Sequence, residues 1–218
     1  MIGRSKATDD AFRHMVHWRW SLLLGSLIFT YILDSVIEQN FVAELISRLL
    51  YVAIFTGVIL SVDLPSRVSR FALAVVFVWP VISFLNIMLS TEFIALADLI
   101  FVVTILVGCL ILVFYELSRK RGIAEDTIPA AIFGYLLVAL AFALFYSRLE
   151  RLQPGSFNFG DSSGDASSLV YFSLVTITTL GFGDITPASR LARVVVGIEA
   201  AAGIMYVAIF IGRIVGRR

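Results

Sequence analysis

The sequence has 218 residues, of which 59% are hydrophobic and 15% charged, and its mean hydropathy is +0.94. A soluble domain of this length carries fewer apolar and more charged residues, so the composition indicates an integral membrane protein. The formal net charge is only +1 and the basic residues are dispersed, which argues against a nucleic-acid partner. The single cysteine, Cys109, allows no disulfide within the chain.

Apolar runs long enough to cross a bilayer, roughly 17 to 25 residues, recur along the chain. The predicted spans cover residues 21–37, 42–62, 71–89, 93–117, 128–146 and about 191–215. Residues 153–168 are rich in Gly, Ser and Asp, and the apolar run that follows, 169–177, is too short to cross. This run predicts a helix that enters the membrane and turns back, or one that is buried within protein. Asp165 is its expected N-cap.

Basic residues predict the orientation of the spans, because Lys and Arg are retained on the cytoplasmic side of a membrane. They gather in the leader, in the loops after the second and fourth spans, and in the C-terminal tail. Six spans place all of these groups on one side, with both termini in the cytoplasm. The first residues, 1–20, are expected to form a leader with a short helix at the inner interface.

The segment TTLGFGD, residues 178–184, interrupts the apolar pattern just before the last span. Non-helical backbone at membrane depth is tolerated only where protein buries it or where it lines a water-filled cavity. Gly181 and Gly183 alternate with Leu180 and Phe182, and glycine enters left-handed backbone conformations at little cost. A strand that alternates in handedness points successive carbonyl groups to one side, which is the geometry that replaces the water shell of a cation.

The run YFSLVTITTLGFGD, residues 171–184, followed by Pro187 and a final apolar span, resembles the pore helix and selectivity filter of the tetrameric potassium channels. The resemblance covers about residues 128–215, and its pattern T-x-x-T-x-G-Phe/Tyr-G-D is highly specific. It implies a homotetramer in a lipid bilayer that conducts K⁺. It implies an ion-conducting filter of Thr179, Leu180, Gly181, Phe182 and Gly183, with K⁺ at the first four. The residues expected to support the filter are Thr176, Thr178, Asp184, Tyr171, Phe172 and Glu199, and Gly203 is the expected gating hinge.

The segment departs from the usual pattern of this family at several positions. Leu180 stands where Val or Ile is usual, and Phe182 stands where Tyr is commonest and cannot donate a hydroxyl hydrogen bond. Tyr171 and Phe172 replace two tryptophans, and Val175 stands where some members carry a glutamate. We expect these changes to alter the rigidity of the filter more than its choice of ion.

Glu199 is an ionisable residue in an otherwise apolar span, where such residues are expensive and are usually functional. It either faces the cavity, where four carboxylates would concentrate cations, or packs behind the filter and bonds the pore helix. In the second arrangement Thr176 or Thr178 would be its partner. We favour the second, because residues this early in the last helix lie beside the pore helix in the family that the segment resembles.

The first four spans occupy the place of a voltage sensor, but the fourth, residues 93–117, carries no arginine. The basic residue within these spans is Arg48, for which Asp34 and Asp98 are the candidate partners in a static buried pair. Opening is therefore expected to depend weakly on voltage.

The expected fold is all-α and integral to the membrane, with six transmembrane helices and a re-entrant pore helix and filter loop between the fifth and sixth. The expected domains are the leader at 1–20, a four-helix domain at 21–117, a cytoplasmic linker at 118–127 and a pore domain at 128–218. The expected function is a potassium-selective channel of the cell membrane that is not an enzyme and uses no cofactor. A non-selective cation channel of the same fold, or a transporter or membrane scaffold, are the alternatives.

Overall fold

The structure is a computed structural model that describes residues 6–36, 41–89, 92–119, 127–162 and 164–215. The chain divides into two compact units, Met1–Phe133 and Gly134–Arg218, which are called unit 1 and unit 2. The division falls within a helix, whereas the sequence predicted a linker at 118–127. Residues 120–126 of that predicted linker, and residues 1–5 of the leader, lie outside the described residues.

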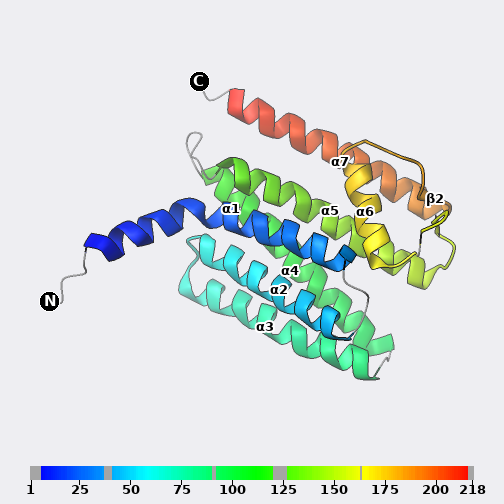
Figure 1. Cartoon of the computed structure of the whole chain (residues 1–218), viewed down its shortest axis with the longest axis horizontal. Coiled ribbons are helices and arrows are strands. Elements are labelled where there is room, and N and C mark those ends of the chain that lie inside the picture. The colour runs from blue at the N-terminus through cyan, green and yellow to red at the C-terminus, as the bar shows by residue number, and fades with distance from the viewer. Residues whose placement is uncertain (1–5, 37–40, 90–91, 120–126, 163, 216–218) are drawn as a thin grey trace. The chain divides into compact units, whose positions relative to one another are not determined.

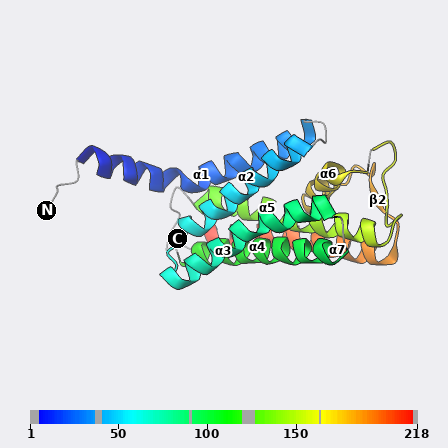
Figure 2. The same ribbon diagram turned by 90° about the horizontal axis from the view of Figure 1, so that it is seen from below.

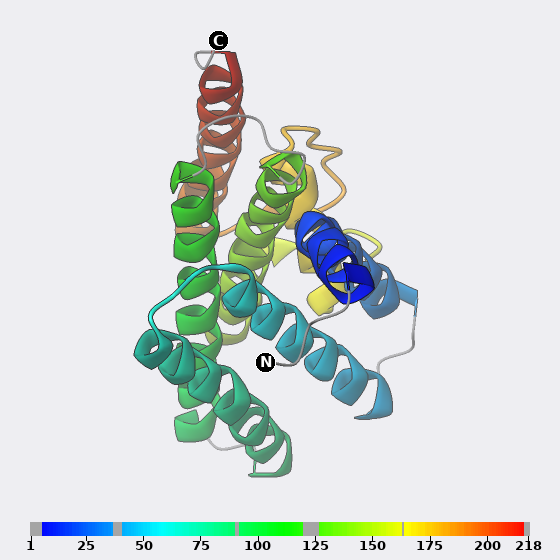
Figure 3. The same ribbon diagram turned by 90° about the vertical axis from the view of Figure 1, so that its left-hand side faces the viewer.

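Unit 1 contains four helices, α1 (Lys6–Val36), α2 (Phe41–Ser61), α3 (Ser66–Leu89) and α4 (Glu92–Arg119). Neighbours in the sequence pack against one another, and α2 also contacts α4 (Figures 1 and 2). Figure 3 shows α2, α3 and α4 in a view turned by 90° about the vertical axis from that of Figure 1. Short connections between consecutive helices make antiparallel neighbours, as is usual in helical bundles.

The helix α1 runs unbroken from Lys6 to Val36, so the leader and the first predicted span form one helix. The sequence predicted a short interfacial helix within residues 1–20 and a first span from Ser21, and the structure has no helix boundary between the two; a position of the leader at the membrane interface stays a prediction. The physical reason is that no Gly or Pro lies between Lys6 and Trp20, so nothing in this stretch breaks the helix. Gly25 is the first glycine of α1, and one glycine weakens a helix without ending it.

Polar side chains within unit 1 are held by specific partners. Arg19 of α1 forms a salt bridge with Glu116 of α4, with Nη2 and Oε1 2.9 Å apart. Asp34 accepts hydrogen bonds from the hydroxyl groups of Ser47 and Tyr51. Because an unpaired polar group in an apolar interior is costly, these bonds fix which faces of α1, α2 and α4 meet.

A second acid, Asp98 of α4, is bonded to α3. Its two carboxylate oxygens accept from the indole N–H of Trp79 at 3.0 Å and from the amide of Asn86 at 3.4 Å. The two acids that the sequence suggested for a pair with Arg48 therefore both receive hydrogen bonds from uncharged side chains.

Unit 2 contains most of α5 (Thr127–Leu152), then β1 (Phe157–Asn158), α6 (Ala166–Ile177), β2 (Thr186–Pro187) and α7 (Arg190–Val215). The strands pair antiparallel, with Phe157 opposite Pro187 and Asn158 opposite Thr186. This pairing ties the segment before α6 to the segment after it. The buried cluster of the unit consists of Tyr146, Leu149, Phe157, Leu169, Phe172, Ile185 and Ala192.

Four helices of the described residues are long and apolar enough to cross a membrane. They span Ser66–Asn86, Leu96–Ser118, Thr127–Leu152 and Arg190–Phe210. They coincide with the third to sixth predicted spans, while the first and second fall on α1 and α2. Seven α-helices are described in all, and the short apolar α6 lies where the sequence predicted a helix too short to cross. The arrangement of six spans and a re-entrant helix stays a prediction.

Candidate functional site: the α6–α7 connection

The helix α6 begins at a complete N-terminal cap. The carboxylate of Asp165 accepts the backbone N–H of Ser168 at 2.8 Å and the hydroxyl groups of Ser167 and Ser168 at 2.8 and 2.9 Å. A side-chain acceptor at this position satisfies one of the N–H groups that the first turn leaves free. The expected N-cap is thus confirmed, and it fixes where the short helix starts.

The end of α6 is bonded to the segment that follows it. The backbone N–H groups of Leu180 and Gly181 both donate to the carbonyl oxygen of Val175, at 3.0 and 3.3 Å. The N–H of Thr179 donates to the carbonyl of Thr176 at 2.9 Å. The Thr178 hydroxyl donates to the carbonyl of Leu174, in the preceding turn of α6, at 2.6 Å. The chain therefore turns tightly and stays attached to the last turn of the helix.

The backbone alternates in handedness along this segment. Positive φ angles occur at Thr179 (59°), Gly181 (57°) and Gly183 (80°), with Leu180 and Phe182 between them on the other side of the Ramachandran map. Among the residues that the structure describes, Thr179 is the only one other than glycine with a positive φ. A β-branched residue resists this conformation, which costs about 1–3 kcal/mol. Such strain persists only where the surroundings hold it, and strained residues of this kind gather at functional sites.

The direction of the first carbonyl groups follows from the hydrogen bonds. The described chain has no cis peptide, so the C=O and N–H of each peptide unit point in opposite directions. The N–H groups of Leu180 and Gly181 point to α6, and the carbonyls of Thr179 and Leu180 therefore point away from it. All residues from 178 to 184 are exposed in the single chain.

Asp184 lies at the C-terminal end of the segment. Its carboxylate accepts from the Tyr171 hydroxyl at 2.7 Å and from the backbone N–H of Ile185 at 3.0 Å. The bond from Tyr171 is the main reason that the pKa of Asp184 lies below its ordinary value, with the N–H of Ile185 acting in the same direction. Tyr171 thus makes a contact between α6 and the end of the segment, although it stands where the resembled family has a tryptophan.

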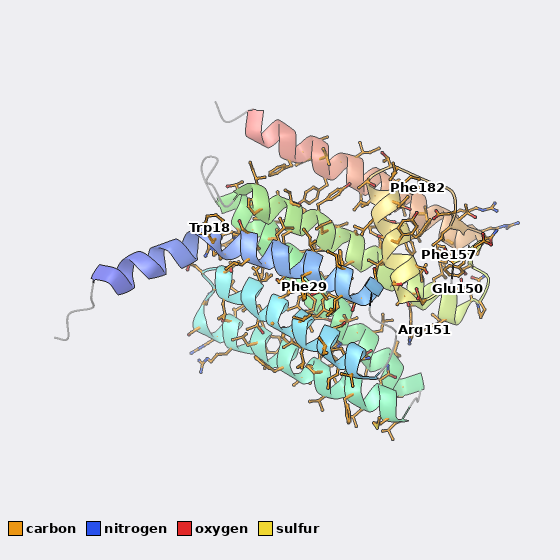
Figure 4. The ribbon with its side chains drawn as sticks, in the orientation of Figure 1. Trp18, Phe29, Glu150, Arg151, Phe157 and Phe182 are labelled. Atoms are coloured by element: carbon orange, nitrogen blue, oxygen red, sulfur yellow. The ribbon has the colours of Figure 1, made fainter. Side chains whose placement is uncertain are left out.

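The aromatic neighbour of Tyr171 has a different role in the packing. Phe172 is buried, and its ring centroid lies 5.5 Å from those of both Tyr146 and Phe157. The β1 segment that carries Phe157 is held by Glu150, whose two oxygens accept the backbone N–H groups of Gly155 and Phe157 at 2.7 and 3.0 Å (Figure 4). The aromatic cluster therefore fastens α6 to α5 and to the β1–β2 pair.

Glu199 of α7 is completely buried within unit 2. One of its carboxyl oxygens accepts from the Tyr146 hydroxyl of α5 at 2.5 Å, and the other bonds the Ser173 hydroxyl of α6. Its contacts are thus with the short helix and with α5. The partners are Ser173 and Tyr146, not Thr176 or Thr178 as the sequence suggested.

Gly203 lies where α7 passes closest to the end of α6. A Cβ atom at Gly203 would lie 2.2 Å from the carbonyl oxygen of Ile177, which is closer than any side chain can approach. The same carbonyl accepts the Tyr135 hydroxyl at 2.6 Å. α7 is helical without interruption through Gly203, so close packing accounts for glycine here. Its role as a gating hinge stays a prediction.

The sequence did not identify Tyr135, Tyr146 or Ser173 as residues of this site. The two tyrosines are 11 residues apart in α5, which is close to three helical turns and places them on one face. Two tyrosines on one face of an apolar span could have indicated this site, because a buried tyrosine hydroxyl needs a hydrogen-bond partner. Ser173 gave no signal of its own, since small hydroxyl residues are common in membrane helices.

Comparison with known families gives one match. Residues 132–217 match a family model described as "Ion channel". No curated protein and no solved structure matches the chain. The matched residues make up less than half of the chain and contain α6, the α6–α7 connection and α7 up to its end. This part of the chain is therefore similar to ion channels, which together with the apolar helices supports a membrane protein that transports ions.

The close approach at Gly203 predicts that Gly203→Ala destabilises unit 2. The added methyl group must displace the backbone of Ile177, and overpacking of this kind costs about 1–3 kcal/mol. The matched control is Gly197→Ala in the same helix, where nothing lies within 4 Å of the added Cβ. Thermal unfolding of the purified protein should show a lower midpoint for Gly203→Ala alone. Equal midpoints for the two variants would contradict the packing role.

The Tyr171–Asp184 bond predicts that Tyr171→Phe raises the pKa of Asp184. The carboxylate loses its main hydrogen-bond donor, so it takes up a proton at a higher pH than in the parent protein. The stability that the charged carboxylate contributes at neutral pH is therefore lost earlier as the pH falls. The measurement is the acid limb of thermal stability against pH, with Tyr115→Phe at an exposed tyrosine of α4 as control. If the acid limbs of Tyr171→Phe and the parent protein coincide, the bond does not hold this carboxylate in its charged form.

Proposed function

We propose that the chain is one subunit of a homotetrameric, potassium-selective channel that conducts K⁺ passively through the membrane. Residues 179–183 form its filter, with K⁺ coordinated by carbonyl oxygens of Thr179, Leu180, Gly181 and Phe182 and by the Thr179 hydroxyl. Asp184 and Tyr171 hold the outer end of the filter, and Phe172, Thr176, Thr178 and Glu199 support it from behind. In this proposal the protein is not an enzyme and needs no cofactor, and K⁺ is the transported ion.

The observation that carries this proposal is the alternation of positive and ordinary φ angles from Thr179 to Gly183. An ordinary extended strand points its carbonyls alternately to both sides, whereas alternation in handedness directs successive carbonyls to the same side. A row of such oxygens can replace the hydration shell of an ion. The negative C-terminal end of α6 lies at the start of the row, where its dipole favours a cation.

A tetramer is supported by the surfaces that the single chain leaves open. One strand supplies oxygens on one side of an ion only, so a cage needs several copies around an axis. Leu180 is 58% exposed and Phe182 is 65% exposed, although both are apolar. Phe182 is labelled in Figure 4. One face of α7 is likewise exposed and apolar, with Leu191, Val194, Ile198, Ile204 and Met205. Other copies of the chain would cover these side chains.

Selectivity for K⁺ is favoured over a non-selective cation channel because the strand keeps both glycines, Gly181 and Gly183, at positive φ. No comparable observation on the described residues favours a transporter or a scaffold. Transporters are commonly built from internal repeats with paired broken helices. The described residues contain one short apolar helix followed by such a strand, between α5 and α7.

The filter is tested by Gly181→Ala, measured as K⁺ flux into liposomes that hold only the purified protein. No atom lies within 4 Å of an added Cβ at Gly181, so the change acts through its φ of 57°, which alanine resists by about 1–2 kcal/mol. We expect K⁺ flux to be lost while the protein still inserts and assembles. Gly197→Ala is the control for a glycine of α7 outside the strand, and Na⁺ flux in the parent protein measures selectivity.

Normal K⁺ flux and unchanged selectivity in Gly181→Ala would mean that this strand is not the filter. Equal Na⁺ and K⁺ flux through the parent protein would favour the non-selective channel. Absence of any ion flux from a correctly inserted protein would favour the scaffold.

The absence of basic residues from α4 before Arg119 predicts a weak dependence of opening on voltage. One charge that crosses the field gains about 2.3 kcal/mol per 100 mV, so steep gating needs several arginines on a moving helix. We expect conductance–voltage curves of the reconstituted protein to report about one gating charge per subunit or fewer. Arg48→Gln is expected to leave the curve unchanged. A steep curve that Arg48→Gln flattens would assign the sensor to α2.

A further inference from the structure

Three short hydrogen bonds join α5, α6 and α7 around Glu199. The Tyr146 hydroxyl contacts one carboxyl oxygen of Glu199 at 2.5 Å, and the Ser173 hydroxyl contacts the other. The Ser173 oxygen also lies 2.6 Å from the backbone carbonyl oxygen of Ala139. Glu199 and Ser173 are both completely buried.

Each of these short contacts joins two oxygen atoms and needs a hydrogen of its own, because a hydrogen that is shared between two acceptors leaves at least one of the contacts long. A hydroxyl group carries one hydrogen, so Tyr146 and Ser173 supply two between them. The carbonyl of Ala139 has none. If Ser173 donates to Ala139, its oxygen meets Glu199 without a hydrogen between them, and if it donates to Glu199, the same is true at Ala139. The third hydrogen can come only from the carboxyl group of Glu199.

The surroundings of Glu199 agree with an uncharged group. Within the described residues, Glu199 forms no ion pair, and the titratable side chains that face it are Tyr146 and Tyr135 of α5. From α6 it receives the hydroxyl of Ser173. A carboxylate that is removed from water and has no cation beside it is strongly disfavoured, whereas a neutral carboxylic acid that is fully hydrogen-bonded is not.

We propose that Glu199 is a neutral carboxylic acid that donates its proton to Ser173, which in turn donates to the Ala139 carbonyl. Tyr146 donates to the remaining oxygen of Glu199. Every oxygen then has its partner, and a continuous hydrogen-bonded chain runs from α7 through α6 to the backbone of α5. Glu199 is a positioning residue: it sets the place of the short helix whose end holds the filter strand, and in this respect the inference rests on the proposed function.

Glu150 of unit 2 is the matched control for Glu199. Glu150 also uses both carboxyl oxygens, but it accepts from the backbone N–H groups of Gly155 and Phe157, each of which brings its own hydrogen. Two contacts and two donors leave no need for a proton on Glu150. The two glutamates therefore differ in the one property that the experiment measures.

The test is infrared difference spectroscopy of the purified protein at neutral pH, comparing the parent with Glu199→Gln. A protonated carboxyl group has a C=O stretching band that is well separated from the carboxylate bands. We expect the parent minus Glu199→Gln spectrum to contain this band, and the parent minus Glu150→Gln spectrum to contain carboxylate bands instead. Carboxylate bands in the Glu199→Gln difference would overturn the proposal.

A second variant keeps the test independent of how well Glu199→Gln folds. Tyr146→Phe removes the donor to the carboxyl oxygen that bears no proton, so the C=O band of Glu199 should move to higher wavenumber. A parent minus Tyr146→Phe spectrum without any change in the protonated-acid region would count against a neutral Glu199.

Flux measurements test the positioning role. The amide of Gln can donate to Ser173 and accept from Tyr146, so Glu199→Gln should keep K⁺ flux close to that of the parent. Glu199→Ala leaves buried polar groups without partners and should lower K⁺ flux by about tenfold or more. Loss of flux in Glu199→Gln to the level of Glu199→Ala would overturn the role. If the infrared band is present but the parent protein passes no ions, the proposed function fails and the neutral acid stands.

Discussion

The carbonyl groups at the end of α6 are the constraint on which unit 2 depends. A helix leaves its last carbonyls without partners, and water that could satisfy them is scarce in an apolar interior. The N–H groups of Leu180 and Gly181 satisfy the carbonyl of Val175, which forces the chain to turn back at once. The carbonyl of Ile177 takes the Tyr135 hydroxyl, and α7 can approach it only because Gly203 has no side chain. The tight turn after α6 and the hydrogen bond from Tyr135 thus both satisfy carbonyl groups that the end of the helix leaves free.

The strain of the strand and the rigidity behind it belong together. Thr179 holds a positive φ that a free chain would leave, so its surroundings must supply about 1–3 kcal/mol. The support comes from both ends, where Val175 receives the first N–H groups and Tyr171 holds Asp184. Aromatic contacts of Phe172 then fix the helix itself. A segment held in this way is preorganised, and in the proposed channel its carbonyls would not need to rearrange to take the place of an ion's water shell.

The sequence predicted the parts of unit 2 that depend on local chemistry. The cap at Asp165, the length of α6 and the left-handed positions of Gly181 and Gly183 follow from rules that act over a few residues, and the structure agrees with them. The bonds of Glu199 could not be predicted, because Tyr146 lies 53 residues away in the sequence and contact depends on how α5 and α7 rotate. The continuity of α1 was not predicted for a local reason. The change of composition at Ser21 suggested a boundary, but no residue there breaks the helix.

Glu199 differs from the partly buried acids Asp34 and Asp98 in the number of hydrogens that its partners supply. Asp34 has the hydroxyls of Ser47 and Tyr51, and Asp98 has the N–H groups of Trp79 and Asn86, so each accepts two bonds from two donors. In these bonds both acids act as acceptors only. Around Glu199 the donors fall one short, since Ser173 must serve both the carboxyl group and a backbone carbonyl. A buried network is stabilising only when every member is satisfied, so the missing hydrogen must be carried by the acid itself.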